Sequence, residues 1–191
     1  MLAINELKKI KQELVEFDKQ RETTIIISRS ILKLSKSAIY STHRNELEKA
    51  KKSLIEAESN IKKITKLIKK IPTLRTIGAY SSALEEYVEA KCFLGFITDK
   101  KLPKKSQLPV TSEEYLLGLC DLTGELSRLA VISATNKKFK KVKEIRDVVE
   151  EIFGFLSSID LRNGELRKKS DSIKWNLKKI EDILYDISMK K

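Results

Sequence analysis

The sequence predicts an all-α protein, in which residues 1–191 form a single domain of about six to seven mostly long, antiparallel helices. Leu, Ile, Lys and Glu dominate the composition, and only 6 Gly and 3 Pro interrupt the 191 residues. Such a composition favours long helices over a turn-rich β-fold. Apolar residues also recur at steps of three and four along most of the chain, whereas no segment alternates like a β-strand. We therefore expect a helical bundle.

The first half of the chain predicts three helices. The first has an apolar face from its start, and no Gly or Pro occurs before Pro72, so it can continue to about Tyr40. A break follows at residues 41–44, where a Ser or Thr side chain could cap the next helix. The second helix carries an apolar stripe over residues 47–71 and ends at Pro72, which cannot continue it. The third is expected over residues 74–98.

The second half predicts three more helices after a basic connection. Residues 99–109 contain two prolines and no periodicity, which indicates a loop. Residues 111–114, Thr-Ser-Glu-Glu, are typical of a helix start, with a hydroxyl cap and acids in the first turn. That helix should reach about residue 135. Another is expected over residues 140–157, and the last begins after Asn163.

The net charge favours a polyanionic partner. The chain carries 39 Lys and Arg against 27 Asp and Glu, a net charge of +12. A surplus of this size favours binding to nucleic acid or to an anionic membrane surface. A lysine-rich surface that keeps a helical protein in solution is an equally good explanation, so charge alone does not decide.

Neither the N-terminus nor the cysteines point to secretion or to a membrane. Residues 1–17 contain no uninterrupted apolar core, so no signal peptide is expected. The longest apolar patch, residues 25–27, is far too short to cross a bilayer. Cys92 and Cys120 match no zinc or redox spacing and lie among apolar neighbours, so we expect buried thiols. The resulting expectation is a cytoplasmic protein with no membrane partner.

Two pairs of acidic residues are the candidates for chemistry. Glu86 and Glu89 lie three residues apart on one predicted helix. Asp121 and Glu125 lie four apart on another, in a segment that is otherwise mostly apolar. Residues at these spacings share a helix face. Carboxylates in apolar surroundings need a counter-charge, which Arg128, a lysine or a divalent cation could supply. Two helices with two carboxylates each are a recurrent way to hold a metal inside a bundle.

The donor atoms indicate which metal such a site would bind. Oxygen ligands favour Mg²⁺ or Mn²⁺ over Zn²⁺, because no His or Cys occurs at a matching spacing. The alternative is structural, since helices rich in Glu and Lys contain acid pairs at these spacings constantly, and most are solvated or salt-bridged. Spacing alone therefore leaves the metal site open.

Four segments of the sequence resemble the translin family. The segment YLLGLCDLTGELSR, residues 115–128, closely resembles the signature helix of the family and looks most like its catalytic branch, translin-associated factor X. The segment EYVEA, residues 86–90, also resembles that branch. Residues 161–188 look more like translin itself, and weaker similarity runs over residues 18–44. The resemblance covers most of the chain.

The resemblance implies a fold, an assembly and an activity. Proteins of this family are all-α subunits that assemble into hollow oligomers, commonly octamers, and bind single-stranded RNA or DNA on a basic interior surface. In the catalytic branch, glutamates and an aspartate bind Mg²⁺ and cut RNA inside the shell. The family's catalytic acids match Glu86, Glu89 and Asp121, with Glu125 as an added acid at a matching position. The non-catalytic translin branch lacks most of this set.

We therefore predict a metal-dependent endoribonuclease that cleaves single-stranded RNA. This chain lacks the long mid-chain insertion and extended termini of the eukaryotic catalytic subunit, so it could form a homo-oligomer, an octamer-like shell, although a heteromeric partner stays possible. Glu86, Glu89 and Asp121 are predicted as metal ligands, and Glu125 as a further ligand or an acid that orients the attacking water. Four basic residues are candidates for phosphate contacts: Arg21, Arg29, Lys36 and Arg75.

Two other interpretations remain open. The first is a translin-like oligomer that binds single-stranded RNA or DNA without cleaving it. The second is a helical scaffold that pairs with partner helices and binds no nucleic acid. Basic side chains are more often solvated or salt-bridged than bound to phosphate, and the run at residues 167–169 could simply face solvent. His43 is expected to be structural, because no carboxylate lies near it at a useful spacing in the sequence.

Overall fold

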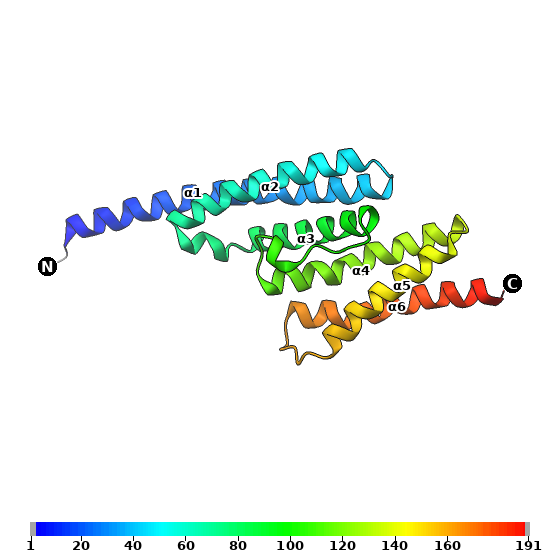
Figure 1. The fold of residues 1–191 in the computed structure, drawn as a ribbon. Helices are drawn as coiled ribbons and strands as arrows, with labels where there is room; N and C mark the ends of the chain where they lie inside the picture. The colour runs from blue at the N-terminus through cyan, green and yellow to red at the C-terminus, as the bar shows by residue number, and fades with distance from the viewer. Residues whose placement is uncertain (1–2, 190–191) are drawn as a thin grey trace.

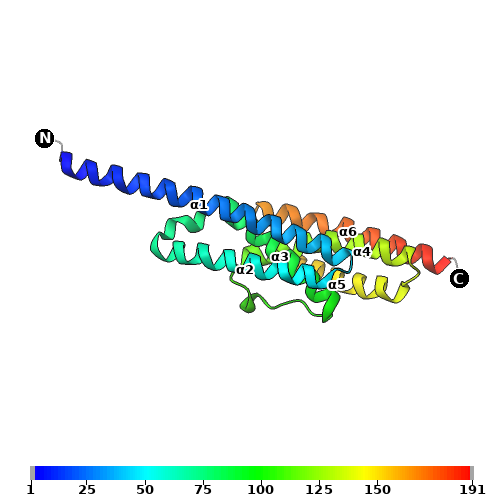
Figure 2. The same cartoon turned by 90° about the horizontal axis from the view of Figure 1, so that it is seen from above.

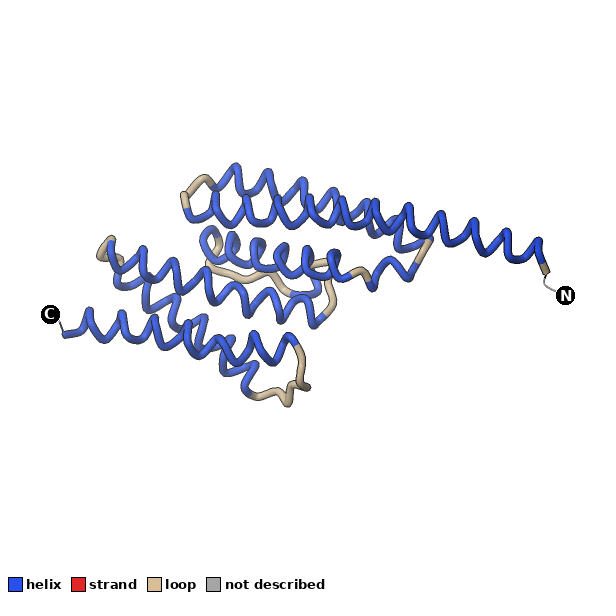
Figure 3. Tube along the Cα trace, turned by 180° about the vertical axis from the view of Figure 1, so that it is seen from behind, coloured by secondary structure: helices blue, strands red, loops and turns tan. Residues whose placement is uncertain are grey.

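Six α-helices and two short 3-10 helices make up residues 3–189, the part of the chain that the computed structural model describes (Figures 1 and 3). The α-helices are α1 (Ile4–His43), α2 (Leu47–Lys70), α3 (Gly78–Thr98), α4 (Ser112–Thr135), α5 (Phe139–Ser157) and α6 (Glu165–Met189). The 3-10 helix η1 (Pro72–Thr76) precedes α3, and η2 (Lys105–Gln107) lies between α3 and α4. The predicted all-α fold class is confirmed.

The helices pack in chain order from one side of the molecule to the other (Figure 1). Helix α1 packs on α2 and α3, α3 packs on α4, and α4 packs on α5 and α6, which also contact each other. One hydrophobic core runs through this arrangement. Every α-helix contributes buried residues to it, among them Ile31, Leu54, Leu84, Leu122, Ile145 and Ile173. The α3–α4 contact therefore joins the two ends of the bundle.

The start of α4 is as predicted, whereas the start of α3 is not. Thr111 Oγ1 accepts a hydrogen bond from the Glu114 backbone N–H (3.2 Å), and the Glu114 carboxylate accepts one from the Thr111 N–H (2.8 Å). Pro72 ends α2 as expected, but η1 follows it and Ile77 is extended (φ −70°, ψ 113°). Helix α3 consequently begins at Gly78, four residues later than the periodicity suggested.

The break between α1 and α2 also differs from the prediction at residues 41–44. Helix α1 continues to His43, and the chain turns at Asn45, whose positive φ of 61° is one that Asn adopts more readily than most residues. Thr42 stays helical and its hydroxyl donates a hydrogen bond to the Ala38 carbonyl (2.8 Å). The expected Ser or Thr cap of α2 is therefore wrong, because both hydroxyl residues belong to α1.

The first part of α1 extends beyond the rest of the bundle (Figures 1 and 2). Residues 3–16 are all exposed. They include five apolar side chains that are 45–65% exposed: Ile4, Leu7, Ile10, Leu14 and Val15. Within residues 3–189, no element therefore covers the apolar face predicted for this part of the helix.

The cysteines and the hydropathy of the helices agree with the sequence analysis. Cys92 and Cys120 are buried free thiols, as predicted. None of the helices within residues 3–189 combines the length and the apolar character that crossing a membrane requires.

Candidate functional site

The four acids singled out in the sequence line one pocket of about 570 Å³. Glu86 and Glu89 come from α3. Asp121 and Glu125 come from α4. Helix α1 closes the pocket, and the remaining lining residues are Lys36, Ile39, Tyr40 and Arg128. Helix spacing puts each acid pair on one face, and the packing of α3 against α4 brings the two pairs together.

A glycine on α4 permits the close approach of the two acidic helices. A Cβ atom at Gly118 would lie 2.7 Å from Val88 Cβ and 2.8 Å from the Glu85 carbonyl oxygen. Real Cβ atoms do not approach other atoms this closely, so only Gly fits at this crossing. Gly118 stands one turn before Asp121, and Val88 directly precedes Glu89. The crossing point therefore sets the separation between the acids of α3 and those of α4.

Glu89 is the most buried of the four acids, at 7% exposure. Within residues 3–189, no group forms a hydrogen bond or an ion pair with its carboxylate. Burial raises its pKa from an ordinary 4.5 to about 8, with added repulsion from the three other acids. A carboxyl group in this environment is stable when it carries a proton or binds a cation.

Glu86 faces a basic residue of α1. Lys36 Nζ lies 3.9 Å from Glu86 Oε2. Burial raises the pKa of Glu86, and Lys36 opposes that shift. The charges of Asp121 and Glu125 raise it again, so the pKa of Glu86 is above its usual range. Lys36 is thus the one predicted phosphate-binding residue that lines the acidic pocket.

Asp121 is held by a lysine of α6. Lys169 Nζ lies 2.7 Å from Asp121 Oδ2 and 3.3 Å from Glu85 Oε2. The suggestion that residues 167–169 simply face solvent is wrong for Lys169. The sequence did contain an indication of this contact, because Lys169 lies one turn before Ile173, on the face of α6 that the core buries.

Glu125 is held by His43, at the end of α1. His43 Nε2 contacts Glu125 Oε2, and the His43 ring packs on Phe93 with ring centroids 4.5 Å apart. The His43 side chain is only 4% exposed. The hydrogen bond from His43 lowers the pKa of Glu125 despite the opposing effect of burial. The expectation that His43 has no carboxylate near it is therefore wrong, because the partner comes from another helix.

The other basic candidates lie outside the pocket. Arg21 and Arg29 are exposed on α1, and Arg21 pairs with Glu22 (3.0 Å). Arg75 donates to both Glu114 oxygens (2.7 Å each), at the capped start of α4. Both hydrogen bonds of Arg75 go to a buried carboxylate at a helix start. This arrangement favours a structural role for Arg75 over a contact with phosphate.

The oxygen ligands of the pocket fit a divalent cation such as Mg²⁺, although the four carboxylates do not converge on one position in this structure. Four carboxylates offer only oxygen ligands, which suit Mg²⁺ or Mn²⁺. Within residues 3–189, no three His, Cys, Asp or Glu side chains are arranged to hold one ion. Asp121 and Glu125 are turned toward Lys169 and His43, which leaves the Glu89 carboxylate as the unpaired member of the set.

Comparison with known proteins identifies the family. The sequence profile of the translin family matches residues 19–191. The chain belongs to the translin family. A protein of Methanocaldococcus jannaschii is 28% identical over 178 residues, which are 90% of this chain and 78% of that protein. Rat translin-associated protein X is 25% identical over 226 residues, covering 96% of this chain and 77% of that protein. Human translin is 36% identical over 78 residues, only 34% of its own length.

Solved structures share the translin-like fold over nearly the whole chain. The crystal structure of apo-NeC3PO matches with a TM-score of 0.87 and 28% identity, covering 97% of both chains. AfC3PO in complex with duplex RNA matches with a TM-score of 0.89 and 23% identity, covering 97% of this chain and 98% of that one. These likenesses confirm the predicted translin-like arrangement of six helices.

Proposed function

We propose that this chain is a metal-dependent endoribonuclease whose active site is the acidic pocket between α1, α3 and α4. The observation that carries the proposal is Glu89, a buried carboxylate without a partner among the described residues, in a pocket that three further acids line. A divalent cation would satisfy this carboxylate at neutral pH and offset the repulsion among the four acids.

The residues of the pocket divide between cation and phosphate binding. Glu86, Glu89 and Asp121 would hold the ion, and Glu125 would be a further ligand or orient the attacking water. When bound, Mg²⁺ or Mn²⁺ would neutralise charge on the scissile phosphate and make the attacking water more acidic.

Two basic residues at the pocket would bind the scissile phosphate. Lys36 and Arg128 line it, and their side chains are more than half exposed, so phosphate oxygens can reach them. His43 would act through Glu125, by fixing the orientation of that carboxylate. Lys169 would similarly hold Asp121 until the cation takes its place.

We propose single-stranded RNA as the substrate, with single-stranded DNA as a possible further ligand. Arg21, Arg29 and Lys36 lie eight and seven residues apart on α1, roughly along one side of the helix, and would lead a strand toward the pocket. The structural neighbour AfC3PO was solved with duplex RNA, which supports RNA as the partner and makes duplex RNA the necessary comparison.

Cleavage of a labelled single-stranded RNA, with Mg²⁺ or with EDTA, tests the proposal. We expect products only with the metal. Glu86→Gln and Asp121→Asn should each lower the rate by on the order of a hundredfold or more. Glu113→Gln, an exposed acid in the first turn of α4, is the matched control and should cleave like the parent. If Glu86→Gln and Asp121→Asn cleave as fast as the parent, the site assignment is wrong.

The second candidate function is RNA binding without cleavage. Its support is that Asp121 and Glu125 already have cationic or hydrogen-bonding partners within the chain, Lys169 and His43. Retention of RNA by a protein that yields no products with Mg²⁺ or Mn²⁺ would select this function over the first.

A further inference from the structure

Two adjoining cavities, each of about 820 Å³, lie beside α2 and away from the acidic pocket. They are bounded by α2, by α3 and by the connection over residues 99–111, and they share Lys91, Pro103 and Gln107. In Figure 2 this connection lies on the α2 side of the molecule, away from α6. We call the two cavities together the basic groove, because seven lysines line it: Lys51, Lys62, Lys66, Lys69, Lys91, Lys101 and Lys104.

The charge around the groove is strongly segregated. Residues 59–84 contain six Lys and Arg and no acid, and residues 100–112 contain four and no acid. Only two acids line the groove, Glu58 and Asp99. Glu58 already accepts hydrogen bonds from the Tyr87 hydroxyl (2.9 Å) and from Lys91 (3.1 Å).

Three lysines of α2 have no counter-charge in the groove. Lys62, Lys66 and Lys69 form no ion pair with any residue of the described part of the chain. They lie at steps of four and three, so they share a helix face and repel one another. Lys51, which lines the groove nearer the start of α2, does have a partner on its own helix, Glu48 (2.8 Å). Lys52, Lys63 and Lys70 of α2 also form no ion pair within residues 3–189. What distinguishes the first three lysines is that they line the groove together, where an external polyanion would stabilise them.

The shape of the groove favours an extended chain of negative charge. Lys51 and Lys69 are 18 positions apart on α2, which is roughly 27 Å along the helix. Among the apolar residues that line the groove, Ile61, Tyr87 and Leu108 are buried, whereas Leu102 and Pro103 are half-buried and Pro109 is exposed. A concave groove that seven lysines line suits a phosphodiester backbone better than a flat bilayer surface does.

We propose that the basic groove is a second RNA site, which binds the backbone of a segment remote from the position of cleavage. Helix α3 separates the two sites: Tyr87 and Lys91 line the groove, whereas Glu86 and Glu89 line the acidic pocket. A long RNA can then contact the protein at both sites. The choice of RNA as the polyanion rests on the proposed function, while the site itself follows from the groove.

Binding of a long single-stranded RNA in EDTA, measured by fluorescence anisotropy over a range of salt concentrations, tests the groove without any cleavage. The variant Lys62→Gln/Lys66→Gln/Lys69→Gln should bind on the order of tenfold to a hundredfold more weakly at about 0.1 M salt. The slope of log affinity against log salt should fall by about two, since each lost contact with a single strand removes about 0.7. The corresponding Lys→Arg variant keeps the charge and should bind like the parent.

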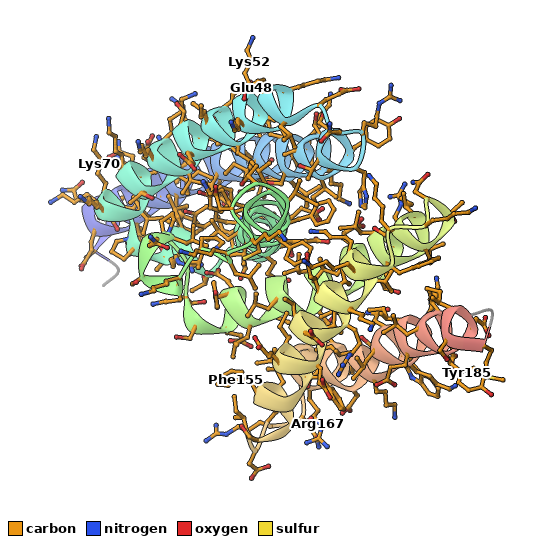
Figure 4. All side chains as sticks on the ribbon, turned by 45° about the vertical axis from the view of Figure 1, so that its right-hand side comes forward. Glu48, Lys52, Lys70, Phe155, Arg167 and Tyr185 are labelled. Carbon is orange, nitrogen blue, oxygen red and sulfur yellow. The ribbon has the colours of Figure 1, made fainter. Side chains whose placement is uncertain are left out.

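The matched control removes three other lysines of the same helix, Lys52→Gln/Lys63→Gln/Lys70→Gln. These are exposed and do not line the groove, and Figure 4 shows Lys52 and Lys70 pointing outward from α2. We expect the control to bind within about twofold of the parent. If both variants bound RNA equally weakly, or if the groove variant bound RNA like the parent, the proposal that the groove binds RNA would be wrong. Cleavage by Glu86→Gln at the parent rate would instead overturn the proposed function and leave the groove standing.

Discussion

Glu89 is the residue on which the account of the site depends most. Its carboxyl group is buried, three other acids line the same pocket, and no described residue offers it a partner. Its pKa of about 8 means that the metal-free protein keeps it protonated at neutral pH. A folded protein gains nothing in stability from this arrangement. The arrangement is accounted for if the pocket binds a cation.

The pH dependence of stability follows from this raised pKa. Unfolded, Glu89 ionises near its ordinary 4.5, whereas in the folded protein it ionises near 8. Between these values the folded state binds the extra proton, so stability falls as the pH rises through the window and levels off above about 8. The Gln side chain of Glu89→Gln does not titrate. The free energy of unfolding of this variant should therefore rise relative to that of the parent as the pH rises through the window, by about 1 kcal/mol or more for each pKa unit. Urea denaturation in EDTA at several pH values measures the gain.

The control for this prediction is Glu113→Gln, which removes an exposed acid that does not line the pocket and should not reproduce the gain in stability of Glu89→Gln. A Glu89→Gln variant that is less stable than the parent by the same amount at pH about 5 and about 8 would show that Glu89 is not protonated in the folded protein.

Two contacts of the site could not be predicted from the sequence. His43 and Glu125 are 82 residues apart, and Lys169 and Asp121 are 48 apart. Helical spacing shows which residues share a face of one helix. It does not show which residue of a distant helix lies opposite. The acid pairs were predictable because each lies within one helix, whereas their partners depend on how α1 and α6 pack.

At the scale of elements, periodicity and stop signals predicted all six α-helices to within a few residues. Helix α4 was the clearest, because Thr111 and Glu114 have the spacing of a helix cap and its end was expected at about residue 135, where it is observed. The 3-10 helix η1 was not predicted. It depends on Leu74, which the core buries completely, and such a tertiary contact has no periodic signal.

The acidic pocket depends on the crossing of α3 and α4, because each of these helices contributes two of its four acids. Gly118→Ala should destabilise the protein by about 1–3 kcal/mol, because the new methyl group would overlap Val88 and the Glu85 backbone. The displaced helices should also lower metal-dependent cleavage, since the acids of the pocket come from both. Thermal unfolding and the RNA cleavage assay measure the two effects.

Gly124→Ala is the matched control on the same helix. A methyl group there meets only Asn176 Nδ2, at 4.0 Å, so we expect unchanged or slightly higher stability from the better helix propensity of Ala. If both glycine variants behaved alike, the close approach at Gly118 would not be what fixes the crossing.

At the scale of the whole molecule, the two proposed sites lie on different sides of α3. Helices α1, α3 and α4 surround the acidic pocket, and α2 with residues 99–111 forms the basic groove. The N-terminal part of α1 extends beyond the other helices (Figure 2). The seven lysines of the groove against its two acids leave an excess of five positive charges, a part of the net +12 whose position the composition alone could not reveal.

If the chain forms the homo-oligomer that the sequence predicts, the exposed apolar face of α1 is the surface that we expect at its interface. Leu7 and Leu14 are 47% and 60% exposed, in a segment, residues 3–16, whose side chains are all exposed in the described structure. Leu7→Gln/Leu14→Gln should shift the mass found by light scattering toward that of one 21.9 kDa chain, because self-association would lose its apolar contact. Ile55→Gln, on α2 and 66% exposed, is the control and should keep the parent mass. An unchanged mass for the α1 variant would exclude this face as an interface.

Calorimetric titration of Mn²⁺ into the metal-free protein tests the central claim, that the acidic pocket binds a divalent cation. At about pH 7 Glu89 is largely protonated, so binding should release a proton, and the heat should differ between buffers of different ionisation enthalpy. Glu89→Gln should bind at least about tenfold more weakly and release less of that proton. Mn²⁺ binding by Glu89→Gln with the affinity and proton release of the parent would contradict the claim, as would a parent protein that binds no Mn²⁺.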